Sequence, residues 1–161
     1  MFANFTKILY CTDMSQTSIH AFGYAAQLAK LSGAEVHILH VVEELSSDAK
    51  VTLQTYIMNE DDRRRMLDER VAQAKAAVEE RQDKFWAGQD AADQAVRGQI
   101  KSVEVCEAYP AEQILKSSIE LGCDLIIMGA HEKGLTHTFL GGVAKSVLRR
   151  SRVPALIVPL P

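Results

Sequence analysis

The hydrophobic positions of this chain fall into five short runs, separated by longer segments in which they recur at helical spacing. Four runs are nearly continuous and the third alternates weakly; they cover residues 8–11, 36–42, 103–106, 125–128 and 155–158. Short apolar strands that lack a polar face are typical of a parallel sheet covered on both sides. We therefore predict an α/β fold, in which strands and helices alternate along the chain.

Four of the intervening segments are predicted to be helices, and they cover residues 15–31, 59–85, 110–121 and 142–150. The first has Ser15 as a candidate N-cap and Gly33 just beyond its end, while the third opens on Pro110, a residue favoured in the first helical turn. Two stretches fit less well. Residues 43–58 mix charged and apolar positions, and residues 87–99 are predicted to be a mobile connector with room for a helical turn.

The length and composition are those of one globular domain spanning residues 1–161. The net charge is −3, from 18 Lys+Arg against 21 Asp+Glu, and this lack of a basic excess argues against a nucleic-acid partner. No apolar run approaches the roughly 20 residues that a membrane span needs, so no membrane contact is expected either.

The cysteines and the amino terminus indicate a cytoplasmic protein without a structural metal. Cys11, Cys106 and Cys123 are sparse, odd in number and far apart, which argues against a disulfide framework and against a zinc site. The first residues lack the basic start and the apolar stretch of a signal peptide. We therefore expect a reduced, cytoplasmic location.

The segment from residue 124 to residue 159 has the plan of a phosphate-binding unit. An apolar run ends at Gly129, a polar loop follows, and Gly141 and Gly142 open a helix that leads to the last apolar run. Glycines let a backbone approach an anion, and the first N–H groups of a helix point at it. This pattern predicts an anion site at the start of the last helix.

A second candidate group follows the first predicted strand. Ligands of open parallel sheets bind beyond the carboxyl ends of the strands, where the winding direction changes. If the first and fourth strands are neighbours, the Asp13 carboxylate faces the glycine loop, where a hydrogen-bond acceptor suits a pair of ribose hydroxyls. The alternative is that Asp13 only caps the following helix, a role for which Ser15 competes.

Five segments, in order and at sensible spacing, resemble the universal stress protein family. They are residues 7–15 (Lys-Ile-Leu-Tyr-Cys-Thr-Asp-Met-Ser), 39–43, 110–115, 122–129 and the Gly-Gly helix with the strand that ends at Pro159. The likeness covers nearly the whole chain apart from a variable segment, residues 45–100. It implies a doubly wound domain of the adenine nucleotide α-hydrolase-like type, with a five-stranded parallel sheet of order 3-2-1-4-5, helices on both faces, and assembly as a homodimer.

Within this family, the motif Gly-x2-Gly-x9-Gly-Ser/Thr after the fourth strand distinguishes a branch that binds ATP from a branch that binds no nucleotide. This chain lies between the two. Gly129 matches the first glycine, but Glu132 stands in place of the second, Gly141 comes one residue early, and Gly142 occupies the Ser/Thr position. Counting nine residues leads instead to Gly142 followed by Val143, which also lacks the hydroxyl.

The resemblance implies an adenine nucleotide, ATP, ADP or AMP, with Mg²⁺ or Mn²⁺ as a possible companion ion. The ligand-binding residues that it implies are Thr12, Asp13, Val41, Met128, Gly129, His131, Gly134, Gly141, Gly142 and Val143. Against phosphate charge the loop offers Lys133 beside Glu132, whereas the amides that open the last helix need no side chain.

Three functions remain open. The first is a homodimeric stress-response protein that binds a nucleotide and acts on an unknown protein partner. The second is the same fold without a ligand, a dimeric interaction module, which Glu132 and the missing hydroxyl favour. The third is an enzyme of the related pyrophosphatase group, whose Ser-Gly-Gly-x-Asp-Ser type of loop is unlike residues 12–15 here.

No catalytic residue is predicted. His131 and His137 follow the fourth strand, but no serine, cysteine or carboxylate is placed to form a nucleophilic pair with either. Slow ATP hydrolysis is the most activity that this pattern allows.

The last predicted strand, Ala155–Val158, stands between Pro154 and Pro159 and would form one edge of the sheet. An edge strand exposes unpaired backbone groups, which proteins usually pair or cover. We therefore predict that this strand pairs in antiparallel fashion with a second copy across a two-fold axis.

Overall fold

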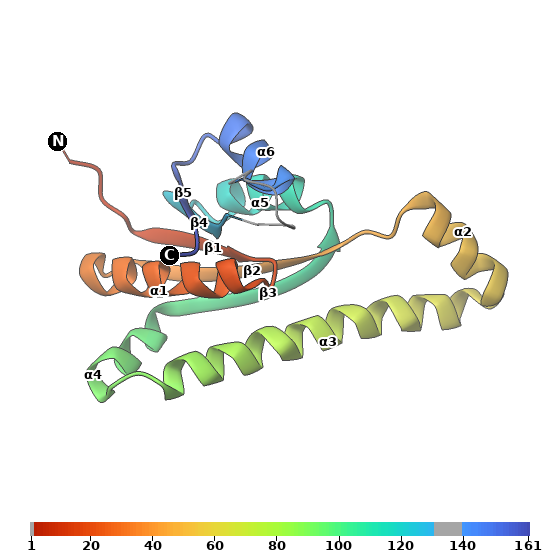
Figure 1. Cartoon of the computed structure of the whole chain (residues 1–161), viewed down its shortest axis with the longest axis horizontal. Coiled ribbons are helices and arrows are strands. Elements are labelled where there is room, and N and C mark those ends of the chain that lie inside the picture. Colours follow the sequence, from red (N-terminus) through yellow and green to blue (C-terminus); the bar gives the residue numbers. More distant parts are fainter. Residues whose placement is uncertain (1, 131–139) are drawn as a thin grey trace.

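A sheet of five parallel strands forms the centre of the molecule in the computed structural model, which describes residues 2–130 and 140–161 (Figure 1). The strands are β1 (Lys7–Thr12), β2 (Glu35–Glu43), β3 (Ile100–Ala108), β4 (Leu125–Gly129) and β5 (Ala155–Val158). Their order is β3-β2-β1-β4-β5, and every neighbouring pair is parallel. The predicted doubly wound fold and its strand order are confirmed.

Helices cover both faces of this sheet (Figure 1). They are α1 (Gln16–Ser32), α2 (Ser47–Tyr56), α3 (Glu60–Ala87), α4 (Ala91–Gln94), the 3-10 helix η1 (Ala95–Gln99), α5 (Pro110–Glu120) and α6 (Gly142–Arg150). Helices α1 and α3 pack on one face, and α5 and α6 pack on the other. Because α1 and α5 lie on opposite faces, the winding direction changes between β1 and β4, which are neighbours.

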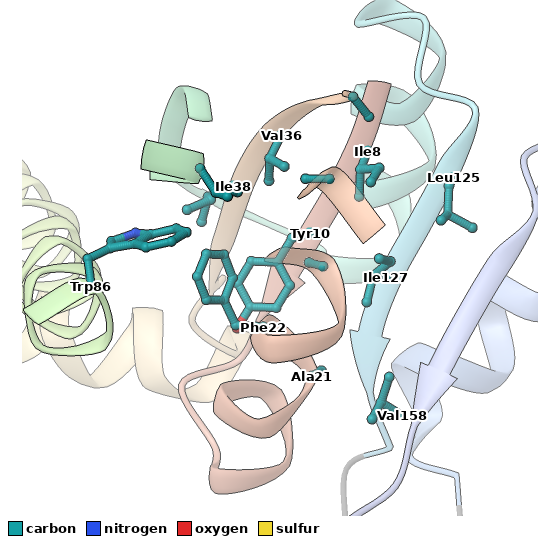
Figure 2. Close-up of a cluster of buried hydrophobic side chains, with 14 of the residues drawn as sticks. Ile8, Tyr10, Ala21, Phe22, Val36, Ile38, Trp86, Leu125, Ile127 and Val158 are labelled. Carbon is teal, nitrogen blue, oxygen red and sulfur yellow. The ribbon is translucent and has the colours of Figure 1, made fainter. Parts of the chain in front are cut away.

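The core between the sheet and α1 is built around aromatic rings. The rings of Tyr10 and Phe22 lie 4.9 Å apart, and Phe22 meets Trp86 of α3 edge-on at 5.8 Å (Figure 2). Trp86 is buried, and its indole N–H donates to the side chain of Gln82 at 3.0 Å. Trp86 anchors the carboxyl-terminal half of α3 to this core.

The opposite core is aliphatic. Leu9, Leu39 and Ile126 from three adjacent strands pack against Ile114 of α5 and Val147 of α6. Side chains of successive strand residues point to opposite faces, and both faces of β1 and β4 are buried. This explains why these strands have no polar face in the sequence.

Helix α1 begins and ends where its sequence predicts. The Ser15 side chain accepts a hydrogen bond from the Ser18 N–H at 3.2 Å, which satisfies a donor of the first turn. At the other end Gly33 has a φ of 74°, in the left-handed region that glycine adopts without a Cβ clash.

Two segments are more regular than the sequence predicts. Residues 43–58, for which the sequence predicts no element, contain the helix α2, none of whose side chains is buried. Residues 87–99 were predicted to be a mobile connector, but they form α4 and η1. The Gln99 side chain holds this segment to the main body by donating to the carbonyls of Ala29 and Ala34, both at 2.8 Å.

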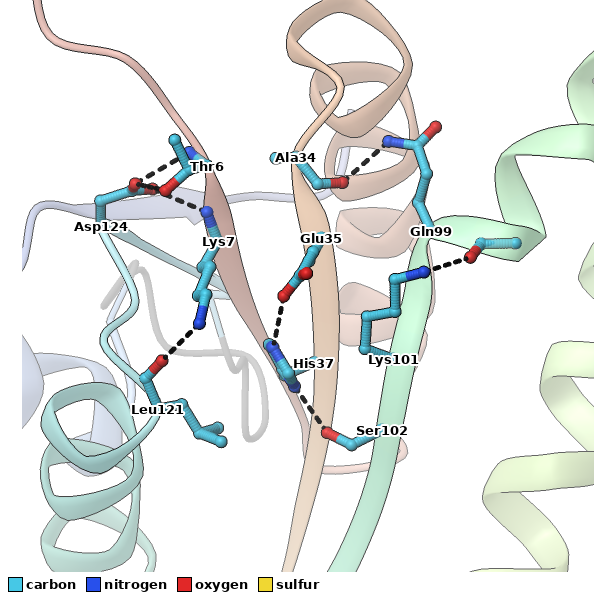
Figure 3. Close-up of polar contacts among 11 residues, drawn as sticks. Thr6, Lys7, Ala34, Glu35, His37, Gln99, Lys101, Ser102, Leu121 and Asp124 are labelled. Carbon is cyan, nitrogen blue, oxygen red and sulfur yellow. Dashed lines mark hydrogen bonds and ion pairs between the residues drawn. The ribbon is translucent and has the colours of Figure 1, made fainter.

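The amino ends of β1 and β4 are joined by the carboxylate of Asp124 (Figure 3). It accepts hydrogen bonds from the Thr6 N–H at 2.8 Å, the Thr6 hydroxyl at 2.7 Å and the Lys7 N–H at 3.3 Å. Burial acts to raise the pKa of Asp124, but these hydrogen bonds outweigh it and lower the pKa. The contact lies at the end of the sheet opposite to the carboxyl ends of the strands.

At the carboxyl end of β4, Gly129 allows α1 to approach the sheet closely. A Cβ atom at this position would lie 2.7 Å from the backbone nitrogen of Ser18 and 2.7 Å from the carbonyl carbon of Thr17. Both neighbours are backbone atoms of a helix, so they cannot turn away as a side chain would. Gly129 is therefore required by packing, whatever else it contacts.

We expect Gly129→Ala to lower the free energy of unfolding by about 1–3 kcal/mol, the usual cost of overpacking a close contact. Urea denaturation would measure it. Gly23→Ala in α1 is the matched control, because a Cβ there meets nothing within 4 Å and alanine favours a helix. Equal stability of the two variants would show that α1 does not approach β4 this closely.

Candidate functional site

A cavity of about 660 Å³ opens beyond the carboxyl ends of β1, β2 and β4. Its walls come from these strand ends, from the first turns of α5 and from the start of α6. This is the place where an open parallel sheet binds its ligands, because the winding direction changes there between β1 and β4.

Most of the residues singled out in the sequence meet at this cavity. Those that line it are Thr12, Asp13, Val41, Met128, Gly129, Gly141, Gly142 and Val143. His131 and Gly134 lie outside the described residues, as do Glu132, Lys133 and His137. The structure thus brings together side chains from the two halves of the chain, while their role in binding stays a prediction.

Several lining residues were not assigned to the site from the sequence. Pro110 and Ile114 enter from α5, and His40 and Glu43 enter from β2. The signal for α5 was present, because Pro110 and Ile114 belong to a segment that resembles the family. The signal for β2 was its parallel pairing with β1, which places its carboxyl end beside Thr12.

Strand β2 contributes a histidine whose orientation is fixed. Nδ1 of His40 lies 2.7 Å from the carbonyl oxygen of Thr12, and because a carbonyl only accepts, Nδ1 carries the proton in this contact. This hydrogen bond ties the end of β2 to the end of β1 at the cavity.

The loop between β1 and α1 is held by a chain of short-range hydrogen bonds. The Met14 N–H donates to the Thr12 hydroxyl at 3.0 Å, and that hydroxyl lies 2.9 Å from the hydroxyl of Ser18. The Ser15 N–H donates to a carboxylate oxygen of Asp13 at 2.9 Å. Ser15 therefore caps α1, and Asp13 braces the turn before it, so the alternative that Asp13 is the helix cap is wrong.

The start of α6 presents backbone donors to the cavity. Gly141 is the N-cap residue, and because glycine has no side chain, no side-chain hydrogen bond caps the N–H groups of the first turn. Gly142, Val143 and Ala144 follow it along the cavity wall. The first N–H groups of a helix lack partners within it and favour negative charge. This arrangement suits a phosphate or another anion.

The charged side chains of the described cavity wall are acidic. They belong to Asp13 and Glu43, and neither lysine nor arginine is found among the described lining residues. The apolar share of the wall comes from residues such as Leu39, Val41 and Ile114. The cavity thus combines an apolar wall, two carboxylates and one helix N-terminus.

Two thiols lie in the aliphatic core, that of Cys11 at the cavity and that of Cys123 near the amino end of β4. Burial raises the pKa of the Cys11 thiol far above its usual range, and it raises the pKa of Cys123 to about 11. Both side chains are buried in the aliphatic core, where they fill space between apolar neighbours.

Over residues 2–130 and 140–161, no group of three metal-ligating side chains occurs, and no helix is long and apolar enough to cross a membrane.

Universal stress proteins are among the known proteins that resemble this chain in sequence and in fold. Universal stress protein MJ0577 of Methanocaldococcus jannaschii is 28% identical over 155 residues, which cover 96% of this chain and 94% of that one. Its solved structure has a TM-score of 0.75 at 26% identity and covers 99% of both chains. YxiE of Bacillus subtilis is 29% identical over 157 residues, covering 96% of this chain and 99% of YxiE.

A more distant likeness concerns the fold alone. A universal stress protein solved in complex with cAMP has a TM-score of 0.54 at 19% identity, and the match covers 98% of each chain. The model of the universal stress protein family itself matches residues 4–159, nearly the full length described above. The chain therefore belongs to the universal stress protein family.

Proposed function

We propose that this protein is a cytoplasmic, homodimeric stress-response module that binds an adenine nucleotide in the cavity beyond β1 and β4. The observation that carries the proposal is the meeting of Asp13 with the first turn of α6 across one cavity. Its volume lies within the range of about 300–1,000 Å³ that is typical of small-molecule sites.

The cavity has groups that suit the base, the ribose and the phosphate of a nucleotide. The apolar side chains of Val41 and Ile114 suit the faces of a purine, and the Asp13 carboxylate suits ribose hydroxyls because it only accepts hydrogen bonds. The N–H groups at the start of α6 suit phosphate oxygens. We assign to His40 the task of holding the loop that carries Asp13.

The charge of the cavity bears on which nucleotide it takes. A triphosphate would share the cavity with the carboxylates of Asp13 and Glu43. Among the described lining residues, those at the N-terminus of α6 would offset part of this negative charge. A divalent cation such as Mg²⁺ or Mn²⁺ would offset this charge, and hard cations prefer oxygen ligands. The described residues hold no three-ligand cluster, so phosphate oxygens would supply most of the ligands. AMP needs the least compensation.

The relatives support this proposal at the level of the family. The universal stress protein solved with cAMP shows that this fold can take an adenine nucleotide. Its likeness to this chain extends to the fold alone, so nucleotide binding is proposed from the cavity itself.

The unpaired Cys11, Cys106 and Cys123 suit a reducing compartment, and we place the protein in the cytoplasm. We propose no enzymatic role beyond slow ATP hydrolysis.

A second candidate is the same dimer without a nucleotide, acting on an unknown protein partner. Glu132 in place of the motif glycine and Gly142 in place of the motif hydroxyl favour it. The acidic charge of the described wall favours it as well. Direct binding measurements separate the two candidates.

We expect calorimetry on the dialysed protein to give micromolar binding of AMP, and of ATP with Mg²⁺. Asp13→Ala should weaken binding about tenfold or more, since a hydrogen bond to a charged group contributes about 1.5–3 kcal/mol. Asp68→Ala, at an exposed position of α3, is the control. The absence of heat and of thermal stabilisation at millimolar nucleotide would select the second candidate.

For the dimer we propose antiparallel pairing of β5, the strand at one edge of the sheet. The carbonyls of Pro154 and Val158 accept hydrogen bonds from Ile126 of β4 and from Ala130, which directly follows β4. The N–H of Ile157 therefore points away from β4 toward the open edge. Ile157→Pro would remove this donor, whereas Ile157→Val would keep it. Sedimentation equilibrium should give a dimer for wild type and Ile157→Val, and a monomer for Ile157→Pro; a monomeric wild type at micromolar concentration would refute the pairing.

A further inference from the structure

An arginine of the long helix α3 reaches the loop that carries Asp13. Nη1 of Arg81 donates a hydrogen bond to the carbonyl oxygen of Met14 at 2.6 Å, across 67 residues of sequence. The contact is partly buried. It joins an outer helix to the turn between β1 and α1, beside the proposed nucleotide site.

The turn itself is conformationally strained. Met14 has a φ of 66°, and it is the single residue other than glycine with a positive φ among residues 2–130 and 140–161. The left-handed region is unfavourable for a residue with a Cβ atom, so other contacts must hold it there. Met14 lies directly between Asp13, which lines the cavity, and Ser15, which caps α1.

Two groups of contacts hold this turn in place. Within the loop, the Met14 N–H donates to Thr12 and the Ser15 N–H donates to Asp13. From outside the loop, the Arg81 guanidinium donates to the Met14 carbonyl, and a charged donor makes a stronger hydrogen bond than a neutral one. Loss of the outside contact would let the peptide after Met14 rotate and would release the Asp13 carboxylate from its position.

We propose that Arg81 is a positioning residue for the nucleotide site: it holds Met14 in the left-handed turn that presents Asp13 to the cavity, and so couples ligand binding to the docking of α3. This inference rests on the proposed function for its ligand. Arg81 is not among the residues that line the cavity, and its effect is exerted through Met14.

A second arginine connects the same helix to the carboxyl-terminal ends of β2 and β3. Nη1 of Arg70 lies 3.4 Å from a carboxylate oxygen of Glu107, and Nη2 lies 3.5 Å from the carbonyl oxygen of Glu43, which lines the cavity. Arg81 follows Arg70 by about 16 Å of helix axis at the usual rise per residue. Helix α3 thus contacts both the loop after β1 and the carboxyl end of β2, and these two segments border one cavity.

The outer part of α3 has few such contacts. Figure 1 shows α2 and the beginning of α3 projecting beyond the sheet. Tyr56, the last residue of α2, is 83% exposed, and Met58, between the two helices, is 87% exposed.

Coupling of binding equilibria is reciprocal. If docking of α3 through Arg81 favours the ligand, the ligand favours docking of α3 by the same factor.

The test uses the full chain with AMP as the ligand. We expect Arg81→Ala to raise the Kd for AMP about tenfold, the factor that corresponds to 1.4 kcal/mol. Without ligand, the same variant should exchange the Met14 and Ser15 amide hydrogens about tenfold faster, because opening of the turn becomes easier. Lys84→Ala is the control: Lys84 lies on the same helix, is exposed and pairs with Glu80, so neither quantity should change.

A rescue separates positioning from general stability. In the Arg81→Ala background, Met14→Gly removes the cost of the left-handed turn, because glycine adopts a positive φ readily. We expect the double variant to regain most of the lost affinity for AMP, and Arg81→Lys, which keeps one charged donor, to lose less than Arg81→Ala. A merely structural role would leave the double variant at least as weak as Arg81→Ala.

These measurements distinguish failure of the positioning role of Arg81 from failure of the proposed function. If wild type binds AMP and Arg81→Ala binds it with the same Kd, the positioning role is overturned and the proposed function stands. If wild type binds no AMP at millimolar concentration, the proposed function fails and the ligand coupling fails with it. Unchanged amide exchange in Arg81→Ala would overturn the role of Arg81 in the turn in either case.

Discussion

The close approach of α1 to the carboxyl end of β4 is the constraint on which the arrangement of the site depends. At Gly129 there is no room for a Cβ atom, because the backbone of Thr17 and Ser18 occupies that space. This contact fixes the first turn of α1 against the end of β4, and therefore fixes the loop that precedes α1. Thr12, the last residue of β1, and Asp13, in that loop, line the same cavity as the first turn of α6. The site thus follows from backbone packing before any side chain recognises a ligand.

Polar contacts then hold the loop at the cavity in one conformation. His40 donates to the Thr12 carbonyl from β2, Ser18 contacts the Thr12 hydroxyl from α1, and Arg81 donates to the Met14 carbonyl from α3. Three separate elements therefore contact Thr12 and Met14, the two residues on either side of Asp13. Preorganisation of this kind reduces the entropy that a ligand must remove on binding. It also offers a physical route by which the cavity and the outer helix α3 influence one another.

The sequence predicts the elements well where burial determines them. The apolar runs locate β1, β4 and β5, Ser15 and Gly33 delimit α1, and the predicted bounds of α6 are those observed. The helix α2 escapes prediction because it buries no side chain, so its sequence has no apolar stripe that must face a core.

At the site, the resemblance to the family indicates the strand ends and glycines, but it does not indicate Arg81. The contact of Arg81 is with a backbone carbonyl, and such a contact leaves no signature in the identity of Met14. The packing role of Gly129 is likewise invisible, because it depends on a helix that arrives from another part of the chain.

An adenine nucleotide bound between Asp13 and the start of α6 would change the environment of the backbone amides on both sides of the cavity. A titration of the isotope-labelled protein with AMP, followed through the backbone amide resonances, measures this change. We expect the largest shifts at residues 12–13 and at the amides of Gly142, Val143 and Ala144, with little change near Asp124 at the opposite end of the sheet. Shifts confined to other surfaces, or no shifts at millimolar AMP, would contradict this expectation.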